Sequence, residues 1–205
     1  MLHNFKTPEE YDEFISQYIS GDFSTYDMEV LIPEVKALRR GDTYVELGVK
    51  YGKSLSVALF AARESVNVVG VDIEDTAERQ EFFKKLGLTG YATFIHGYSH
   101  LAAKIFARSV SLLFIDANHS YDDWLRDILS WLPLMRPGGV ILFHDCDESS
   151  RGVVAAANEV FPNRVQLFKT PEKNTSMAKV VIRAWDTKFS QPKSSARPSR
   201  TLKIT

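Results

Sequence analysis

The sequence has only one cysteine, Cys146, among its 205 residues. A single cysteine excludes an internal disulfide framework and fits a reducing compartment. No apolar stretch approaches the ~20 residues that a membrane-spanning helix needs. Residues 1–6 do not resemble a secretory leader, because they already contain His3 and Asn4. We therefore expect a cytoplasmic protein with no membrane partner.

The sequence also lacks an excess of charge of either sign. Its 25 basic and 26 acidic side chains give a net charge of −1. Nucleic-acid-binding domains usually show a basic excess, so we expect no nucleic-acid partner. Hydrophobic residues make up 44% of the chain and charged residues 25%, as in ordinary globular domains.

The most informative segment is a turn with two glycines near residue 50. It follows a short apolar run and carries Gly48 and Gly52, four positions apart, just before an amphipathic stretch. Such a turn between a strand and a helix lets a ligand approach bare backbone N–H groups. A second apolar run, 68–71, ends in Asp72, and an acid at that distance suits the two hydroxyls of a ribose. The pattern predicts a site for a nucleoside-containing cofactor.

The glycine spacing distinguishes among such cofactors. It is G-x-x-x-G, which differs from the dinucleotide fingerprint G-x-G-x-x-G and from the phosphate-binding loop, although Lys53-Ser54 superficially suggests the latter. Glu46, just ahead of Gly48, would repel a pyrophosphate but attract an amino group. Here the sequence resembles the class I S-adenosylmethionine-dependent methyltransferases, whose first motif is acid-x-G-x-x-x-G. The alternative is an ordinary α/β turn with a solvated acid.

Strand and helix patterns alternate from residue 42 onward. We expect strands at 42–47, 67–72, 91–95, 111–116 and 139–144, and helices at 53–64, 76–86, 98–107, 120–131 and 151–160. The runs 165–168 and 178–183 have only a polar turn at 169–174 between them, which predicts an antiparallel hairpin. The fold class is therefore α/β: a Rossmann-like, doubly wound, seven-stranded, mostly parallel sheet with a C-terminal antiparallel hairpin. An all-parallel dinucleotide-binding sheet would not close in this way.

Two further segments flank the predicted domain, which covers 41–186. Residues 1–40 form a helical leader, with helices from a Thr7 cap and over 28–39, that we expect to act as a lid or to mediate a homo-oligomer. Plain helical packing is the alternative. Residues 187–205 are rich in Ser, Pro and basic residues and predict a flexible tail.

Polar residues follow two neighbouring strands. The fourth predicted strand runs into Asp116, and the fifth runs into His144-Asp145. Adjacent strands lie about 4.8 Å apart, so Asp116 and Asp145 should approach each other, and two such carboxylates repel unless they share a proton or a cation. Oxygen ligands favour Mg²⁺, or alternatively Mn²⁺ or Ca²⁺. His119 lies three residues past Asp116, where a neutral imidazole can accept a proton from a hydroxyl. Its alternative roles are a metal ligand, a cap contact or a surface residue.

The two strand-end motifs carry a closer resemblance. Leu-Phe-Ile-Asp-Ala-Asn-His-Ser-Tyr and Pro-Gly-Gly-Val-Ile-Leu-Phe-His-Asp resemble a methyltransferase branch that includes macrolide-sugar O-methyltransferases and cephalosporin-hydroxylase-like proteins. The resemblance implies that Asp116, His144 and Asp145 hold a divalent cation. Relatives usually have an acid–acid or acid–amide pair after the fifth strand. His144 departs from that pattern, and a substrate contact or a metal-free site is the alternative.

The same resemblance implies a function. S-adenosylmethionine would donate a methyl group to a hydroxyl of a small-molecule acceptor, with His119, Asp116 and His144 as the catalytic residues. Relatives often have an acid at the position of Tyr98. The implied cofactor-binding residues are Glu46, Gly48, Gly52, Ser54, Asp72, Ile73, Tyr98, Ser99 and Asp116. The alternatives are a metal-independent N-methyltransferase, a non-catalytic S-adenosylmethionine-binding module and an NAD-dependent oxidoreductase.

Overall fold

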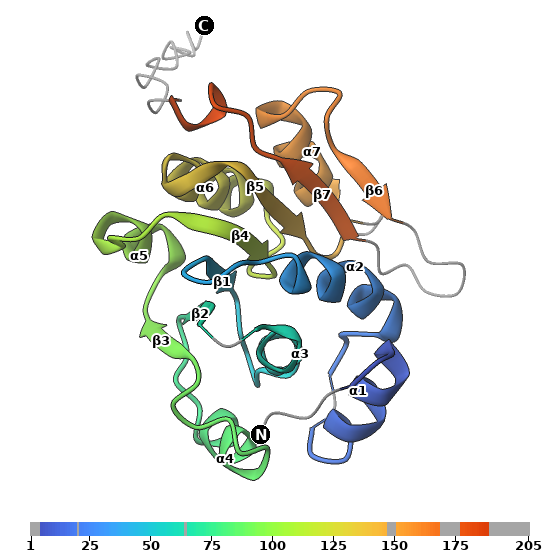
Figure 1. Cartoon of the computed structure of the whole chain (residues 1–205). Helices are drawn as coiled ribbons and strands as arrows, with labels where there is room; N and C mark the ends of the chain where they lie inside the picture. Colours follow the sequence, from blue (N-terminus) through green and yellow to red (C-terminus); the bar gives the residue numbers. More distant parts are fainter. Residues whose placement is uncertain (1–4, 20, 64, 147–150, 169–176, 189–205) are drawn as a thin grey trace, which may run out of the picture.

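The computed structural model describes residues 5–19, 21–63, 65–146, 151–168 and 177–188. The predicted polar turn at 169–174 and most of the predicted tail (189–205) lie outside these residues. The described strands form one seven-stranded sheet in the order β3-β2-β1-β4-β5-β7-β6 (Figure 1). Their bounds are β1 Thr43–Leu47, β2 Asn67–Asp72, β3 Thr93–His96, β4 Val110–Ile115, β5 Met135–Phe143, β6 Gln166–Phe168 and β7 Met177–Val181.

The first five strands of the sheet run parallel, and β7 is antiparallel to both β5 and β6. The predicted fold class is therefore confirmed, including the closing hairpin. The central strands β1 and β4 are buried along their whole length, as expected for parallel strands covered on both faces.

Helices cover both faces of the sheet (Figure 1). Two clusters of buried hydrophobic side chains fill the two interfaces between helices and sheet. One face is packed by α1 (Pro8–Ile15), α2 (Thr25–Lys36), α3 (Lys53–Ala61) and α4 (Ala77–Lys85). The other is packed by α5 (Ser99–Ile105), α6 (Tyr121–Trp131) and α7 (Arg151–Val160). Short 3₁₀ turns follow at Leu132–Leu134 and Asp186–Lys188. Among the described helices, none has the length and apolar character that crossing a membrane requires.

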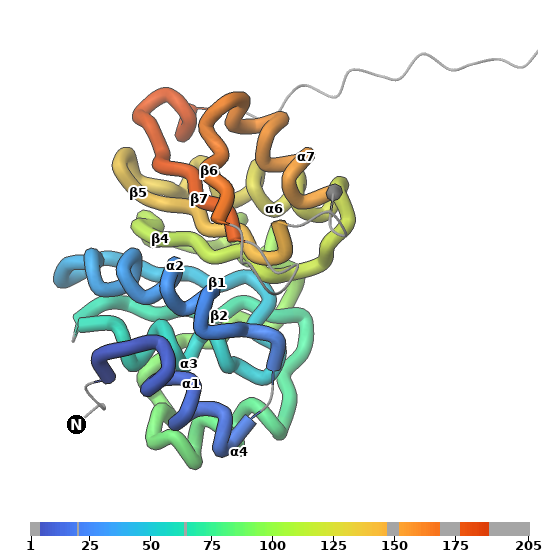
Figure 2. Tube along the Cα trace, turned by 90° about the vertical axis from the view of Figure 1, so that its right-hand side faces the viewer, coloured from blue at the N-terminus to red at the C-terminus, as the bar shows by residue number. Residues whose placement is uncertain are grey.

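The leader helices share one core with the sheet. Tyr11 and Ile15 of α1 and Met28 and Leu31 of α2 are at most 1% exposed and belong to the same cluster as Phe114 of β4. Both helices contact α3, and Figure 2 shows them on the same side of the sheet as α3. Their predicted role in a homo-oligomer remains a prediction.

Several predicted boundaries differ from the structure. Helix α2 begins at Thr25 and not at 28, because Ser24 and Asp27 form a capping box that the apolar periodicity does not reveal. Strand β5 begins four residues earlier than predicted, because Met135 pairs with Val110 before a register shift that absorbs residues 136–139. Helix α3 ends at Ala61, three residues early, and the remaining strand ends lie within two residues of the predicted ones.

Candidate active site

A cavity of about 490 Å³ opens at the carboxyl ends of the parallel strands, where ligands bind in doubly wound folds. Its volume lies within the range of small-molecule pockets. Six of the nine predicted cofactor residues line it: Gly48, Asp72, Ile73, Tyr98, Ser99 and Asp116. The cavity also has lining residues that the sequence did not predict, among them Asn118, Asp123, Arg126 and Asp127.

Glu46 lies behind the glycine turn and does not line this cavity. Its carboxyl group is fully buried and accepts hydrogen bonds from the hydroxyls of Tyr44 (2.6 Å) and Ser54 (2.7 Å). Burial raises the pKa of Glu46 to about 8, so the group is largely neutral at pH 7. In this geometry Glu46 and Ser54 connect β1 to the first turn of α3.

The two glycines of the turn make room for other parts of the protein. Gly48 has φ +83°, and a Cβ on it would lie 2.0 Å from the carbonyl oxygen of Asp116. Gly52 has φ +95°, and a Cβ there would lie 2.4 Å from the Phe83 ring. Positive φ angles already favour glycine. Gly48 therefore lets the loop after β4 come close, and Gly52, which does not line the cavity, admits α4.

Asp72 holds the glycine turn in place from the end of β2. Its Oδ2 accepts from the backbone N–H groups of Val49 (2.7 Å) and Lys50 (2.6 Å), and its Oδ1 accepts from Glu74 N–H (2.8 Å). A carboxylate offers about four acceptor positions. About one position is thus left for a ligand hydroxyl in the cavity that Asp72 lines.

A second carboxyl group, Asp127 of α6, lines the same cavity. The Ser99 hydroxyl donates to it, and Trp131 Nε1–H donates to the Ser99 carbonyl at 3.1 Å. Burial raises the pKa of Asp127 to about 6. Sequence analysis missed this residue. The available signal was an acid within the apolar stripe formed by Trp124, Ile128 and Trp131.

The strand-end cluster comes together as the strand spacing predicted. Ligand atoms of Asp116, His144 and Asp145 all lie within 4.8 Å of one another. His144 Nδ1 is 3.2 Å from Asp116 Oδ1 and 3.3 Å from Asp145 Oδ2. The backbone turns at Asp145, which has φ 51°. This turn lets two consecutive residues approach the same point, whereas along a strand they would face opposite sides.

His144 is buried among carboxylates. His144 is only 3% exposed. Neither of its ring nitrogens makes a hydrogen bond within the described part of the chain. Burial alone would lower the pKa of His144, but the carboxylates of Asp116, Asp145 and Asp27 outweigh it and raise the pKa well above the ordinary value. Asp27, from leader helix α2, is the third acid, with Oδ2 3.5 Å from His144 Nε2. Sequence analysis did not identify it.

These residues fit a divalent cation. A buried imidazole nitrogen without a hydrogen bond lies within 3.3 Å of carboxylate oxygens from Asp116 and Asp145. Nitrogen and oxygen donors of this kind bind divalent metal ions in proteins. Asp116, His144 and Asp145 are the side chains that would hold it.

His119 pairs with the cluster from the loop before α6. Its Nε2 lies 2.7 Å from Asp145 Oδ2, and its side chain is half exposed. His119 does not line the 490 Å³ cavity. It lies beside the carboxylate pair, outside that cavity.

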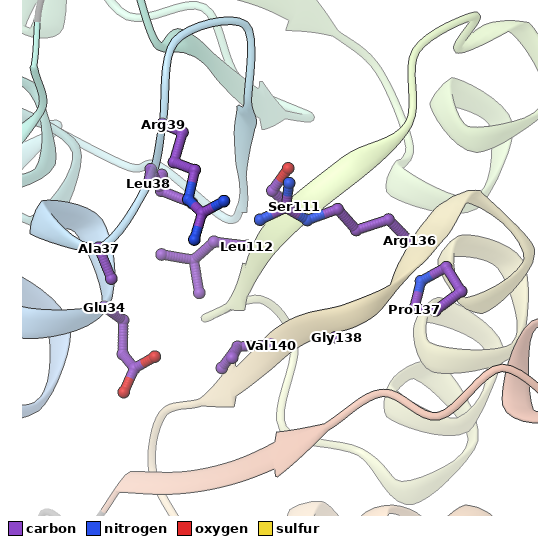
Figure 3. Close-up of a pocket in the computed structure, with 10 residues that line it drawn as sticks. All are labelled: Glu34, Ala37, Leu38, Arg39, Ser111, Leu112, Arg136, Pro137, Gly138 and Val140. Atoms are coloured by element: carbon purple, nitrogen blue, oxygen red, sulfur yellow. The ribbon is translucent and has the colours of Figure 1, made fainter.

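A second cavity, of about 400 Å³, lies near the start of β4, at the end of the strand opposite the cluster (Figure 3). Arg39 and Arg136 extend toward Ser111 there. Asp42 pairs with Arg136 and accepts from the Ser111 hydroxyl, while Glu34 pairs with Lys179. Much of the charge at this end is therefore neutralised within the fold, and the cavity contains none of the predicted site residues.

Comparison with known proteins identifies the class to which this site belongs. Residues 45–146 match the family described as a methyltransferase domain, and this span contains the glycine turn and both strand-end motifs. The fold and the site thus define a class I methyltransferase. The chain is thus identified as an S-adenosylmethionine-dependent methyltransferase.

Solved structures share the fold at low sequence identity. An S-adenosylmethionine-dependent O-methyltransferase from Thermotoga maritima is 16% identical, with a TM-score of 0.67 over 84% of this chain and 71% of that chain. A Bacillus cereus O-methyltransferase in complex with S-adenosylhomocysteine is 16% identical (TM-score 0.64, 89% and 93% covered). A TDP-rhamnose 3'-O-methyltransferase of calicheamicin biosynthesis is 14% identical (TM-score 0.59, 85% and 92% covered). A putative rRNA methylase from Clostridium thermocellum also shares it, so the fold alone does not select the acceptor. No curated protein sequence matches the chain significantly.

Proposed function

We propose that this methyltransferase methylates a hydroxyl oxygen of a small molecule, assisted by a divalent cation held by Asp116, His144 and Asp145. The observation that supports this most strongly is that Asp116 belongs both to the cavity lining and to the strand-end cluster. Asp116 lines the 490 Å³ cavity, and its Oδ1 lies 3.2 Å from His144 Nδ1. An acceptor at the cluster would therefore lie next to the cofactor.

Residues around the cavity would orient the cofactor. Asp72 has about one free acceptor position for a ribose hydroxyl, and the Ser99–Asp127 pair and the exposed Tyr98 ring line the same cavity. We assign the adenine to the Ser99–Asp127 pair, with Asp127 in place of the acid that relatives have at the position of Tyr98. The reaction forms a bond between the acceptor oxygen and the methyl carbon while the carbon–sulfur bond breaks, so alignment is the main contribution of the protein.

The acceptor hydroxyl must lose its proton, and we propose His119 as the group that accepts it. Asp145 Oδ2 accepts from His119 Nε2–H at 2.7 Å, which leaves Nδ1 as the basic nitrogen of the ring. A bound divalent cation would supply positive charge that favours the anionic form of the acceptor oxygen. Nitrogen acceptors need neither aid, so the base and the cluster together favour an oxygen acceptor.

The charge of the site favours a small acceptor over RNA. The net charge is −1, and the cluster adds Asp27, Asp116 and Asp145 in one place. RNA binding depends on neutralising phosphates with basic side chains. The similar sugar O-methyltransferase makes glycosides a first group of acceptors to test.

The proposal is tested with S-adenosylmethionine labelled in its methyl group. Sugars, phenols, aliphatic alcohols, amines and an rRNA fragment are offered to enzyme stripped with EDTA and then supplied with Mg²⁺, Mn²⁺ or Ca²⁺. We expect transfer to hydroxyl acceptors that falls at least tenfold on stripping and returns with metal. Transfer to amines that is insensitive to EDTA would support the N-methyltransferase alternative, and transfer only to RNA would overturn the small-molecule assignment.

A further inference from the structure

Leader helix α2 delivers a buried carboxylate to the metal-binding cluster. Asp27 is 1% exposed, and its Oδ2 lies 3.5 Å from Nε2 of His144, which is 3% exposed. The two residues are 117 positions apart, one in the leader and the other at the end of β5. A charged group is rarely buried this deeply unless it is paired.

The N-terminus of α2 fixes the Asp27 carboxylate. The N–H and the hydroxyl of Ser24 both donate to its Oδ2, at 2.8 and 2.7 Å, and Asp27 N–H donates back to the Ser24 hydroxyl at 3.4 Å. This capping box holds the side chain against the helix end. The carboxylate is therefore placed before any ligand arrives.

The His144 ring packs beside two aromatic rings, and its two nitrogens face different carboxylates. The Phe23 and Phe114 rings flank it at centroid distances of 5.8 and 6.0 Å. Its Nε2 faces Asp27, and its Nδ1 faces Asp116 and Asp145. Both nitrogens are buried without a hydrogen bond among the described residues. Each nitrogen therefore lies near a carboxylate without forming a hydrogen bond to it.

We infer that Asp27 is a positioning residue that accepts Nε2–H of His144 and thereby directs the Nδ1 lone pair at a divalent cation bound with Asp116 and Asp145. The inference rests on the proposed metal-assisted function. Metal-ligating histidines usually donate their second ring N–H to a carboxylate or carbonyl, which fixes the tautomer and strengthens the ligand. Here the leader supplies that carboxylate, so residues 24–27 belong to the metal site.

The test measures Mn²⁺ binding to the full chain, by the loss of the free-ion electron paramagnetic resonance signal and by calorimetry. Mutation of such a hydrogen-bond partner typically weakens metal binding 10–100-fold, and we expect a decrease in this range for Asp27→Asn, which removes the negative charge of the partner. The matched control is Asp42→Asn, which alters another buried, hydrogen-bonded aspartate at the opposite end of the sheet. It should change Mn²⁺ affinity less than threefold. S-adenosylhomocysteine affinity should change less than threefold in Asp27→Asn, since Asp27 does not line the cofactor cavity.

Two outcomes separate this inference from the proposed function. If the wild-type chain binds Mn²⁺ and Asp27→Asn binds it equally well, the inference is wrong and the metal-assisted function stands. If the wild-type chain binds no Mn²⁺ at millimolar concentration, the metal-assisted function fails, and the inference with it.

A second measurement covers the case that Asp27→Asn does not fold. Long-range ¹H–¹⁵N correlation spectra of the wild-type chain with Mg²⁺ report the tautomer of His144. We expect a proton on Nε2 and none on Nδ1. A proton on Nδ1 in the Mg²⁺-loaded protein would overturn the inference without any variant.

Discussion

His119 Nε2 lies 2.7 Å from Asp145 Oδ2, and the same oxygen lies 3.3 Å from His144 Nδ1. One carboxylate thus connects the half-exposed histidine with the buried one. Asp145 can bind a cation and still accept from His119, because a carboxylate oxygen has more than one lone pair. The proposed proton acceptor and the proposed metal ligands are therefore connected through one carboxylate.

His119→Gln should lower kcat for methyl transfer by about 10²–10⁴-fold, the usual contribution of a positioned base. The affinity for S-adenosylhomocysteine should stay within threefold of wild type, because His119 does not line the cofactor cavity. Steady-state kinetics and calorimetry measure the two quantities. Asp122→Asn, an exposed change on the first turn of α6, is the control and should leave both unchanged. A His119→Gln enzyme with wild-type kcat would remove the base from the mechanism.

Asp127→Asn should weaken discrimination between adenine and hypoxanthine. The carboxylate would accept from the exocyclic amine of adenine, which hypoxanthine lacks, so the wild-type enzyme should bind S-adenosylhomocysteine at least tenfold more tightly than S-inosylhomocysteine. Because burial raises the pKa of Asp127 to about 6, the carboxyl becomes protonated as the pH falls through 6. S-adenosylhomocysteine affinity should then decrease below pH 6 in the wild type and not in the variant. Calorimetry at pH 5, 6 and 7.5 measures both effects, and equal preference in both proteins would contradict the assignment.

Glu46→Gln should change how stability depends on pH. Burial raises the pKa of Glu46 to about 8 in the folded protein from an ordinary 4.5, so between these values the folded state binds more protons than the unfolded state. Wild-type stability should therefore fall as the pH rises through this window, by about 1 kcal/mol per unit from this group. The variant should lose that contribution and keep near wild-type stability at pH 5. Urea unfolding at pH 5, 6 and 7 gives the slopes, and identical slopes would mean that Glu46 is ionised in the fold.

Gly48→Ala should disrupt the cofactor turn. Its Cβ would lie 2.0 Å from the Asp116 carbonyl oxygen, on a backbone with φ +83°. Gly87 is a matched control, because it has φ +68° and nothing within 4 Å of an added Cβ. Backbone strain alone costs about 1–3 kcal/mol, so Gly87→Ala reports that cost. Gly48→Ala should lower Tm further than the control and weaken S-adenosylhomocysteine binding more than tenfold, as thermal melts and calorimetry would show.

The sequence predicted those parts of the fold that depend on local pattern. Alternating apolar runs predicted a mostly parallel sheet with a closing hairpin, and continuous apolar strands such as β4 marked the buried centre of the sheet. Boundaries failed where long-range pairing decides them. Met135 belongs to β5 only because Val110 lies beside it, and no local signal contains that pairing.

The candidate site was predictable only in part for a similar reason. Asp116 and Asp145 could be placed together, because strand ends in a parallel sheet meet at one edge. Asp27 and Asp127 were missed because both lie on helices whose orientation toward the site depends on packing. Each was nevertheless an acid on an otherwise apolar helix face. Such a position indicates that a polar partner lies in the part of the protein against which the helix packs.

Strand β7 inserts between β5 and β6 and pairs with residues 140–143, immediately before His144. During synthesis, β5 therefore emerges long before the neighbour that completes its second edge. At least 181 residues must leave the ribosome before all of β7 is available to pair with β5. Nascent chains stopped short of β7 should consequently be unable to retain a divalent ion, even though every proposed ligand has already been translated.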